Sequence, residues 1–396
     1  MRILHVVSRL NFGGAEKQVV ELARQLAARG HDVTIYTLNS DVPRERELAG
    51  SGVTLIVDQK QAKFDPALLW RLRKFIAGWR PDIIHGFLFD GDFYSRVAAL
   101  GTGVPVLNSE RNDNYRLSPS QSIAHCLTRR LACGVVANTH SGKAFAERLF
   151  VLPADRVHVV WNGIRVDELE RQAAAGTVDC RDEFFAERGI RVACLVGTIS
   201  PRKDYHLALE TAARLIALDP AWRVLFIGDE ILPPGPYRHG SHSDTREYKA
   251  DIVKRYDALG LADKIRFTGM RTDVPAIVRQ CDVLYVTSRH EGFPNVVLEA
   301  MGLGVPVVST EYSDIRRILP LSRQVVAGRA PGDIARTVLW AHAERGIIAL
   351  RQKEWVRAHA TIEKAGLDLE QIYRHYVQPA NPRGQRAEAC PARPLN

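Results

Sequence analysis

The sequence has few of the features that mark secreted, membrane-spanning or metal-binding proteins. Its 396 residues contain 6 cysteines and no C-x-x-C pair. A zinc site or a disulfide framework therefore has no support, and reduced thiols are the expectation. No apolar run approaches the roughly 18 residues of a membrane-spanning helix. The apolar run at the amino end is cut by Arg9 and lacks the core and cleavage site of a signal peptide. We expect a cytoplasmic protein.

The common signatures of nucleotide-dependent enzymes and of hydrolases are also missing. The turn at residues 9–14 has no G-x-G-x-x-G, and the next predicted strand is followed by Asn39 rather than an acidic residue. Ser141-Gly142-Lys143 resembles part of a Walker loop, but Ala137 stands where its first glycine belongs. No G-x-S-x-G elbow occurs. Hydride transfer, P-loop hydrolysis and serine-hydrolase chemistry thus lose their main support.

The composition is that of an ordinary globular protein with a basic surplus. Hydrophobic residues make up 46% and charged residues 25%, while 29 Gly and 20 Pro are near background. The net charge of +9 predicts an anionic partner, such as a phosphorylated small molecule or an acidic lipid surface. Nucleic acid is not expected, because the basic residues are spread along the chain without a recognition motif. The length predicts two or three domains.

Short apolar runs alternate with helical patterns along most of the chain. Such repeated β-then-α units predict parallel sheets with right-handed crossovers. Two runs of similar length predict an α/β protein with two doubly wound domains that face each other across a cleft. The predicted strands are residues 3–8, 33–38, 82–85, 104–107, 135–137 and 157–161 in the first half, and 191–196, 223–227, 265–267, 283–287, 305–309 and 324–327 in the second.

These patterns divide the chain into segments. We expect an amino-terminal domain over residues 1–165 and a second domain over 166–362, which begins with a helix-like connector. Helical patterns from 331 to 377 end in a helix over 363–378. Residues 379–396 have no periodicity and read as a disordered tail. The loop over 229–248 contains His239 and His242, which we expect to be exposed rather than metal-binding.

The most informative segment runs from Cys281 to Gly302. It reads as a strand, a polar turn and a helix that begins near Pro294, which suits the first helical position. A helix start is a ready site for phosphate. Glu291 precedes the helix and Glu299 lies in its second turn. Paired carboxylates beside an anion site fit a ligand that also carries vicinal hydroxyls; alternatively, Glu291 complements the helix dipole and Glu299 is a surface acid.

This segment resembles the E-x₇-E signature of the retaining glycosyltransferases of family 4. That resemblance implies the GT-B architecture, with two facing Rossmann-like domains, a deep interdomain cleft and carboxy-terminal helices that cross back to the first domain. Other motifs occur in the family's order, and they are Gly13–Glu16, Asp82–His85, Trp161–Ile164, Gly197–Lys203, Gly269–Val274 and Val305–Val308.

The resemblance implies a reaction and a set of roles. Such enzymes transfer a sugar from a nucleoside diphosphate, here a UDP or GDP sugar, with retention and without a metal or cofactor. The acceptors are glycans or lipid-linked molecules of polysaccharide, lipopolysaccharide or glycolipid biosynthesis. Glu291 would hold the transferred sugar, Glu299 the ribose and Lys203 the diphosphate. The remaining residues implied in donor binding are Thr198, Arg202, Arg271, Gly292, Phe293, Pro294, Asn295 and Val296.

The sequence departs from the family at two positions. The family usually has an arginine where Thr198 stands, and often a second histidine where Phe87 stands. Arg202 is a candidate substitute for the missing cation, although neighbouring side chains in an extended loop point apart. His85 is implied in catalysis at the end of its strand, whereas a lone histidine there is more often a packing residue. The alternative function is a non-catalytic protein that binds sugar nucleotides.

The first domain contributes further candidates. Gly13 and Gly14 would let the backbone approach the diphosphate or the acceptor. Arg111 would bind an acidic or phosphorylated acceptor, or it is a surface charge. The basic, aromatic helix at residues 70–80 has an apolar stripe of Leu69, Leu72, Ile76 and Trp79, so we expect it to pack on the sheet. Peripheral contact with an anionic membrane rests on the basicity of the whole chain.

Overall fold

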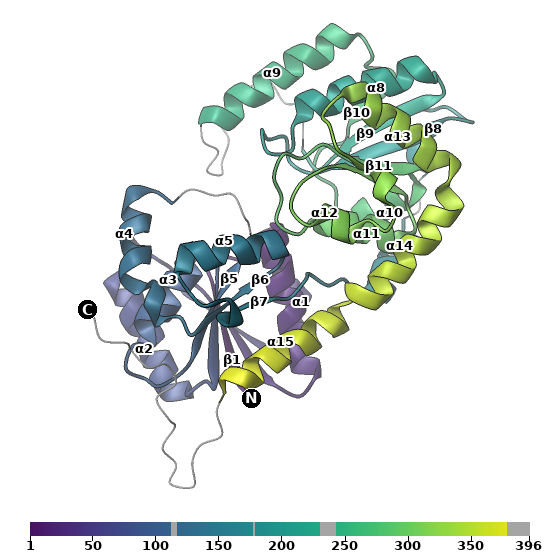
Figure 1. The fold of residues 1–396 in the computed structure, drawn as a ribbon. Helices are drawn as coiled ribbons and strands as arrows, with labels where there is room; N and C mark the ends of the chain where they lie inside the picture. Colours follow the sequence, from purple (N-terminus) through teal and green to yellow (C-terminus); the bar gives the residue numbers. More distant parts are fainter. Residues whose placement is uncertain (112–116, 177–178, 230–242, 378–396) are drawn as a thin grey trace. The chain divides into compact units, whose positions relative to one another are not determined.

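The computed structural model describes residues 1–111, 117–176, 179–229 and 243–377. The chain forms two compact units, which are described separately below (Figure 1). Unit 1 comprises Met1–Gly163 and the chain from Ala360 onward, and unit 2 comprises Ile164–His359. The proposed tail over 379–396, and most of the loop over 229–248 with His239 and His242, lie outside the described residues.

Unit 1 contains a seven-stranded parallel sheet in the order β3-β2-β1-β4-β5-β6-β7. Its strands are β1 (Arg2–Val7), β2 (Asp32–Thr37), β3 (Val53–Val57), β4 (Ile83–Phe87), β5 (Val106–Glu110), β6 (Gly134–Ala137) and β7 (Val157–Val159). Strand β3 was not predicted from the sequence. This edge strand is half-exposed along its length and pairs only with β2, so it lacks the continuous apolar run of a buried parallel strand.

Helices cover the sheet of unit 1. They are α1 (Gly14–Ala28), α2 (Pro66–Trp79), α3 (Leu88–Ala98), α4 (Pro119–Thr128), α5 (His140–Phe150) and α15 (Ile362–Tyr376), with short turns η1 (Pro43–Leu48), η2 (Arg129–Leu131) and η3 (Ala154–Arg156). The stripe on α2 packs as predicted. Leu72 and Ile76 are fully buried in a core cluster with β1 and β4, and Leu69 and Trp79 pack against it.

Unit 2 contains a six-stranded parallel sheet in the order β10-β9-β8-β11-β12-β13. Its strands are β8 (Arg191–Val196), β9 (Trp222–Ile227), β10 (Ile265–Phe267), β11 (Val283–Val286), β12 (Val307–Thr310) and β13 (Val325–Val326). The predicted strands of this half all occur, and their observed ends differ from the predicted ends by no more than two residues. Two parallel sheets flanked by helices confirm the predicted α/β class.

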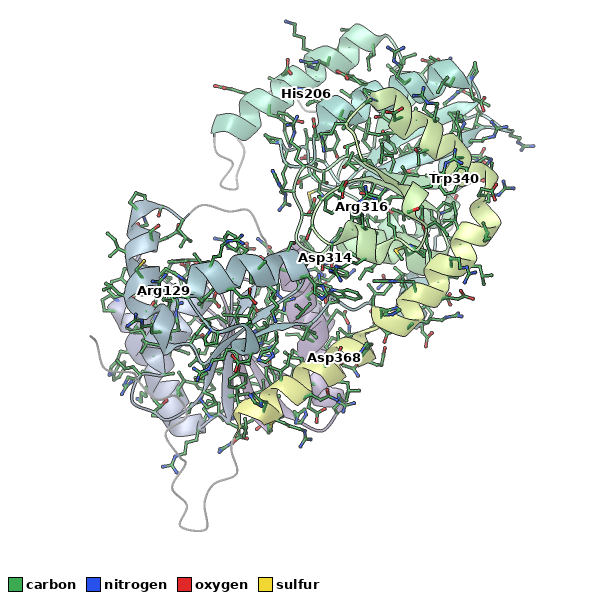
Figure 2. All side chains as sticks on the ribbon, viewed as in Figure 1. Arg129, His206, Asp314, Arg316, Trp340 and Asp368 are labelled. Atoms are coloured by element: carbon green, nitrogen blue, oxygen red, sulfur yellow. The ribbon has the colours of Figure 1, made fainter. Side chains whose placement is uncertain are left out.

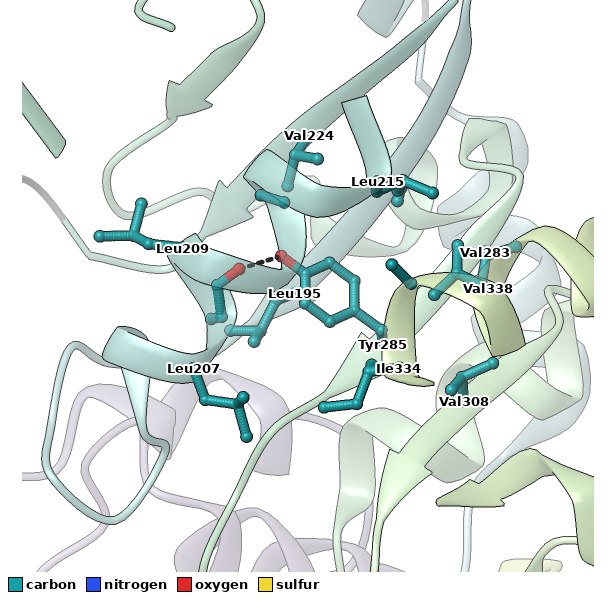
Figure 3. Packing of buried hydrophobic residues seen from close by; sticks show 14 of the residues in the cluster. Leu195, Leu207, Leu209, Leu215, Val224, Val283, Tyr285, Val308, Ile334 and Val338 are labelled. Atoms are coloured by element: carbon teal, nitrogen blue, oxygen red, sulfur yellow. Dashed lines mark hydrogen bonds between the residues drawn. The ribbon is translucent and has the colours of Figure 1, made fainter. Parts of the chain in front are cut away.

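The helices of unit 2 pack on both faces of its sheet. They are α6 (Val166–Ala174), α7 (Cys180–Phe184), α8 (Tyr205–Leu218), α9 (Ser243–Leu259), α10 (Val274–Gln280), α11 (Asn295–Leu303), α12 (Ile315–Ile318), α13 (Pro331–Ala343) and α14 (Arg345–His359), with η4 (Ser322–Gln324). Figure 3 shows the core between the strands, α8 and α13. Tyr285 of β11 crosses it, and its hydroxyl donates to the carbonyl oxygen of Ala208 at 3.1 Å.

The last helix, α15, belongs to unit 1 although it follows all of unit 2 in the sequence. It packs against α1. Glu370 of α15 accepts hydrogen bonds from Arg29, at the end of α1, at 2.5 Å, and from Arg374 at 2.6 Å. Burial alone would raise the pKa of Glu370, but these hydrogen bonds and the nearby positive charge lower it to about 2. The carboxyl is therefore ionised at neutral pH and holds α15 in place.

Candidate functional site

The order of the strands in unit 2 brings two predicted motifs together. β8 and β11 are neighbours in the sheet, and Ala193 of β8 pairs with Val283 of β11. From β8 the chain continues to one side of the sheet, and from β11 to the other, so this is the topological switch point. Ligands of open parallel sheets bind at the carboxyl ends of strands at such a point. The segment Gly197–Lys203 leaves β8 there, and the segment that carries Glu291 leaves β11 there.

Hydrogen bonds to backbone carbonyl oxygens join the two segments. The amide of Arg289 donates to the carbonyl oxygen of Arg202 at 2.8 Å. The hydroxyl of Thr287 donates to the carbonyl oxygen of Lys203 at 2.8 Å. These contacts hold the Gly197–Lys203 loop against the turn that follows β11. The Lys203 side chain therefore lies beside Glu291.

Glu291 is a buried carboxylate between two cations. It is 8% exposed. Its Oε1 lies 2.7 Å from Nζ of Lys203, and its Oε2 lies 4.0 Å from a guanidinium nitrogen of Arg202. The hydroxyl of Ser288 donates to Oε1 at 3.1 Å. Burial acts to raise the pKa of Glu291, but the charges of Lys203 and Arg202 outweigh it, so the pKa is lowered. The carboxylate is thus ionised, as a group that holds sugar hydroxyls requires.

The arrangement of Arg202 corrects the expectation that it points away from Lys203. The loop is not extended at this point, because the amide of Lys203 donates to the carbonyl oxygen of Ser200 and that of Asp204 to Pro201. These tight turns place both side chains beside the same carboxylate. Thr198, where the family usually has an arginine, is exposed and contributes no charge.

A glycine allows Lys203 to lie close to the loop. Gly197 has a φ of +151°, which side chains rarely tolerate. A Cβ atom at this position would lie 2.9 Å from Cε of Lys203. The glycine after β8 therefore provides the space in which the lysine reaches Glu291.

A second charged group, not predicted from the sequence, lies beside this loop. Asp204 is buried, adopts a left-handed backbone conformation with φ of 51° and caps α8. Its Oδ2 lies 2.9 Å from Arg289 and 2.7 Å from Arg329. Arg329 also donates to the carbonyl oxygen of Thr287 at 2.6 Å. This pair is hard to predict from the sequence, because Arg329 is remote from Asp204 in the chain and only the folded sheet brings the two together.

The remaining donor-site candidates of this segment lie on or beside α11. Pro294 is the residue before the helix rather than its first residue, and α11 begins at Asn295. The turn residues Gly292, Phe293 and Pro294 are buried. Asn295, Val296 and Glu299 are half-buried, and Glu299 lies in the second turn as predicted. The helix start and Glu291 therefore share one end of β11.

Arg271 lies apart from the Glu291 group. It follows β10 and forms ion pairs of 2.8 Å with Asp273 and with Glu183. Its guanidinium also lies over the ring of Phe184, 5.7 Å from the centroid. The side chain is thus engaged with one carboxylate just before α10 and with another on α7.

The structure corrects the predicted position of His85 in unit 1. His85 lies in the middle of β4 rather than at its end, and it is 0% exposed. Its Nδ1 lies 2.6 Å from the hydroxyl of Tyr373, and its Nε2 lies 2.7 Å from the hydroxyl of Ser109. Burial, followed by the nearby His5 and Arg111, lowers its pKa well below the usual value. Both ring nitrogens therefore already have hydrogen-bond partners within unit 1.

The other unit 1 candidates lie at the start of α1 and just after β5. Gly13 precedes α1 and Gly14 is its first residue. A Cβ atom on Gly13 would lie 2.1 Å from the carboxylate of Glu16, so this glycine accommodates the Glu16 side chain. Arg111 follows β5, donates to Oδ1 of Asn162 at 3.1 Å and lies over the ring of Phe87. It is therefore a packed, partly buried charge rather than a freely exposed one.

Two further properties concern the whole of the described chain. Within the described residues, no group of three or more His, Cys, Asp or Glu side chains is arranged to hold a metal ion. Among the helices that the structure describes, none combines the length and the apolar character needed to cross a bilayer.

Comparisons with known proteins agree over most of the chain. The model for Glycosyltransferase Family 4 matches residues 12–168, and that for Glycosyl transferases group 1 matches residues 181–344. A D-inositol 3-phosphate glycosyltransferase of Frankia alni is 28% identical, over 93% of this chain and 96% of its own length. A GDP-mannose:cellobiosyl-diphosphopolyprenol alpha-mannosyltransferase of Xanthomonas campestris is 26% identical, over 83% of this chain and 84% of its own. The solved structure of Anabaena Alr3699/HepE in complex with UDP has a TM-score of 0.78 at 17% identity, and covers 95% of this chain and 100% of that one.

Proposed function

The chain belongs to family 4 of the glycosyltransferases and has their GT-B fold, and from this premise we propose that it transfers a sugar from a nucleoside-diphosphate sugar with retention of configuration. The proposed acceptor is a glycan or a lipid-linked molecule of cell-surface polysaccharide or glycolipid biosynthesis. The observation that carries this proposal is the ionised Glu291 beside Lys203 and the start of α11.

The proposed chemistry follows from these groups. Cleavage of the sugar–phosphate bond leaves negative charge on the diphosphate, and fixed cations and helix-start amides that face this charge lower the barrier. Lys203 is the proposed diphosphate cation. Glu291 accepts hydrogen bonds from hydroxyls of the transferred sugar, and Glu299 accepts those of the ribose. In this proposal the reaction needs no metal or cofactor, because protein groups supply the positive charge.

The relatives support the proposed classes of substrate. One is named for GDP-mannose and a diphosphopolyprenol acceptor, another for a phosphorylated inositol, and the Anabaena protein was solved with UDP. These names favour UDP or GDP sugars as donors. They also favour an acceptor that carries phosphate, for which the basic surplus of the chain is suited.

The proposal is tested by substitution at the Glu291 group. We expect Glu291→Ala and Lys203→Ala each to lower the transfer of labelled sugar from UDP or GDP sugars to a membrane extract by about 100-fold or more. The matched control is Glu311→Ala. Glu311 is also a carboxylate of unit 2 paired with a cation, in this case the exposed Arg316 (Figure 2), and its loss should leave transfer unchanged. Full activity in both site variants, with unchanged melting temperature, would overturn the proposal.

A second candidate function is sugar-nucleotide binding without catalysis. The buried His85 favours it, because both nitrogens of this ring are bound to hydroxyls within unit 1 and would have to leave these partners to contact a substrate. The same assay separates the two functions. If the wild-type protein binds a labelled sugar nucleotide but neither transfers nor hydrolyses it, the non-catalytic function is supported and the transferase is excluded.

We further propose that the protein acts at the cytoplasmic face of an anionic membrane. An exposed apolar surface on unit 1 supports this contact. On α4, Ile123 is 63% and Leu127 is 78% exposed. Arg129, labelled in Figure 2, and Arg130 follow this helix directly. Apolar side chains flanked by arginines suit an acidic lipid surface, where burial and charge attraction act together.

A further inference from the structure

We propose that Arg202 and Lys203 together form the diphosphate site, that Arg202 replaces the cation missing at Thr198, and that the Glu291 carboxylate occupies this pair until a diphosphate displaces it. The inference rests on the proposed function and deepens it. Glu291 is then an internal anion that holds the place of the donor's charge.

Lys203 and Arg202 contact different oxygens of the Glu291 carboxylate. One cation approaches each oxygen of the carboxylate, with Lys203 Nζ at 2.7 Å from Oε1 and the Arg202 guanidinium at 4.0 Å from Oε2. Carboxylates and phosphates offer similar pairs of acceptor oxygens, which is why the same cationic groups recognise both. The two cations that contact the Glu291 carboxylate are therefore also placed to contact a diphosphate.

Lys203 and Arg202 bind Glu291 with different closeness and differ in exposure. The Lys203 side chain is 13% exposed and makes a true hydrogen bond, whereas that of Arg202 is 48% exposed. A separation of 4.0 Å is an ion pair and not a hydrogen bond. The N–H groups of Arg202 therefore remain available to an incoming acceptor. Its backbone is nevertheless held in place by Arg289, whose amide donates to the Arg202 carbonyl oxygen at 2.8 Å.

The charges of Arg202, Lys203 and Glu291 do not cancel. Arg202 and Lys203 face one negative charge on Glu291, so the pair has a surplus positive charge. The neighbouring Asp204 does not remove this surplus, because Arg289 and Arg329 already pair with it. A diphosphate carries more negative charge than a carboxylate, and it therefore matches the pair better. The displaced Glu291 then needs new donors, and the sugar hydroxyls of the same ligand supply them.

This exchange couples the two halves of donor recognition. While Glu291 is bound to the cations, its Oε1 already accepts from Lys203 and from the Ser288 hydroxyl, so fewer acceptor positions remain for a sugar. When the diphosphate takes the cations, the carboxylate is released beside the group that it is proposed to hold. A free sugar without diphosphate should therefore bind poorly.

The test is calorimetric titration of the full-length protein with UDP and GDP, using the nucleotide that the wild type binds. We expect Arg202→Ala to weaken binding about 10- to 100-fold, as for loss of a charge-assisted hydrogen bond. Glu291→Gln should bind the nucleoside diphosphate at least as tightly as the wild type, because the competing charge is gone, even though transfer is lost. Restored binding in the double variant Thr198→Arg, Arg202→Ala would give further support.

The matched control is Arg316→Ala. This exposed side chain of unit 2 pairs with Glu311 rather than with Glu291 or Asp204, so the variant should bind nucleotide like the wild type. Wild-type affinity in Arg202→Ala overturns the assignment of Arg202. Weakened binding in Glu291→Gln overturns the role of Glu291 as a competitor. A wild-type protein that binds neither nucleoside diphosphates nor sugar nucleotides contradicts instead the proposed function itself.

Discussion

At the scale of single residues, burial has opposite consequences for two side chains to which the same family resemblance assigns a catalytic role. Glu291 is buried against Lys203 and Arg202, so the charged form is stabilised by its partners. His85 is buried among Tyr373, Ser109 and His5, so the neutral form is favoured. A buried charge requires opposite charge, whereas a neutral ring requires only hydrogen bonds. The residue type does not decide between these outcomes.

The buried histidines of unit 1 predict sensitivity to acid. The Nε2 atom of His5 lies 3.0 Å from the Tyr373 hydroxyl, and burial, together with the charge of Arg111, lowers its pKa from 6.5 to about 3. Below pH 6.5 the unfolded chain binds a proton that the folded chain refuses, so stability falls as the pH decreases. Between pH 7.5 and 5 we expect this ring to cost about 2 kcal/mol.

Hydrogen exchange of peptides from β1 and β4 at these two pH values, corrected for intrinsic exchange rates, measures this loss. In His5→Gln the dependence on pH should be shallower. His359→Gln, which removes an exposed histidine of α14, should behave like the wild type. An identical pH dependence in His5→Gln and the wild type would contradict the prediction.

At the scale of secondary-structure elements, α2 and α4 differ in which apolar residues they bury. The apolar stripe of α2 faces the sheet, as its helical spacing predicts. On α4, by contrast, Ile123 and Leu127 face outward while His125 is buried. Lys63, just before α2, donates to the hydroxyl of Ser120 on α4 at 3.1 Å, so the starts of the two helices are adjacent. The surface candidate for membrane contact is therefore α4, with the loop before α2 beside it.

The outward face of α4 gives a testable prediction. We expect Ile123→Asp, Leu127→Asp to weaken binding to vesicles that contain acidic lipid by about 10-fold or more, because two large apolar side chains no longer enter the interface. Ile347 and Leu350 of α14 form an exposed apolar pair in unit 2, and the same double substitution there is the control. Co-sedimentation with the vesicles measures both. Equal binding of the α4 variant and the wild type to the vesicles would contradict the proposed membrane contact.

At the scale of the whole molecule, the chain leaves unit 1 once and returns to it once. It leaves after Gly163 and returns at Ala360, and the two crossing segments touch. A Cβ atom on Gly163 would lie 2.6 Å from the Cα of Ile362. The side-chain amide of Gln18 donates to the carbonyl oxygen of Gly163 at 3.0 Å, and its oxygen accepts from the Gly163 amide at 3.1 Å. The glycine thus allows α15 to start against the exit from unit 1.

This junction predicts the effect of two alanine substitutions. Gly163→Ala should lower the free energy of unfolding by about 1–3 kcal/mol, since the new methyl group meets backbone that cannot move freely. Gly346→Ala should have the opposite sign, a gain of about 0.5–1 kcal/mol, because that helical glycine of α14 has open space around it. Thermal unfolding of both variants gives the comparison. A Gly163→Ala variant as stable as the wild type would contradict this role of Gly163.

Periodicity and motif order were sufficient to predict much of the fold and of the family. The alternation of strands and helices follows from local apolar patterns, and the strand at residues 191–196 is predicted to the residue. The half-exposed β3 was missed because its stability comes from pairing with β2 rather than from its own pattern. Glu291 and Lys203 were named from motifs that each lie within a short stretch of sequence.

The amino-acid sequence by itself determined the α/β class, the family and the residue types of the segment from Cys281 to Gly302, because these depend on local patterns. Only the tertiary structure decided which charges meet. It placed Arg202 with Lys203 on one carboxylate, brought Arg329 to Asp204 and enclosed His85 beneath Tyr373 of α15. The physical reason is that charge pairing and burial depend on distances across the sheet, between residues far apart in the chain. A spacing along the sequence does not contain those distances until the strands have taken their order.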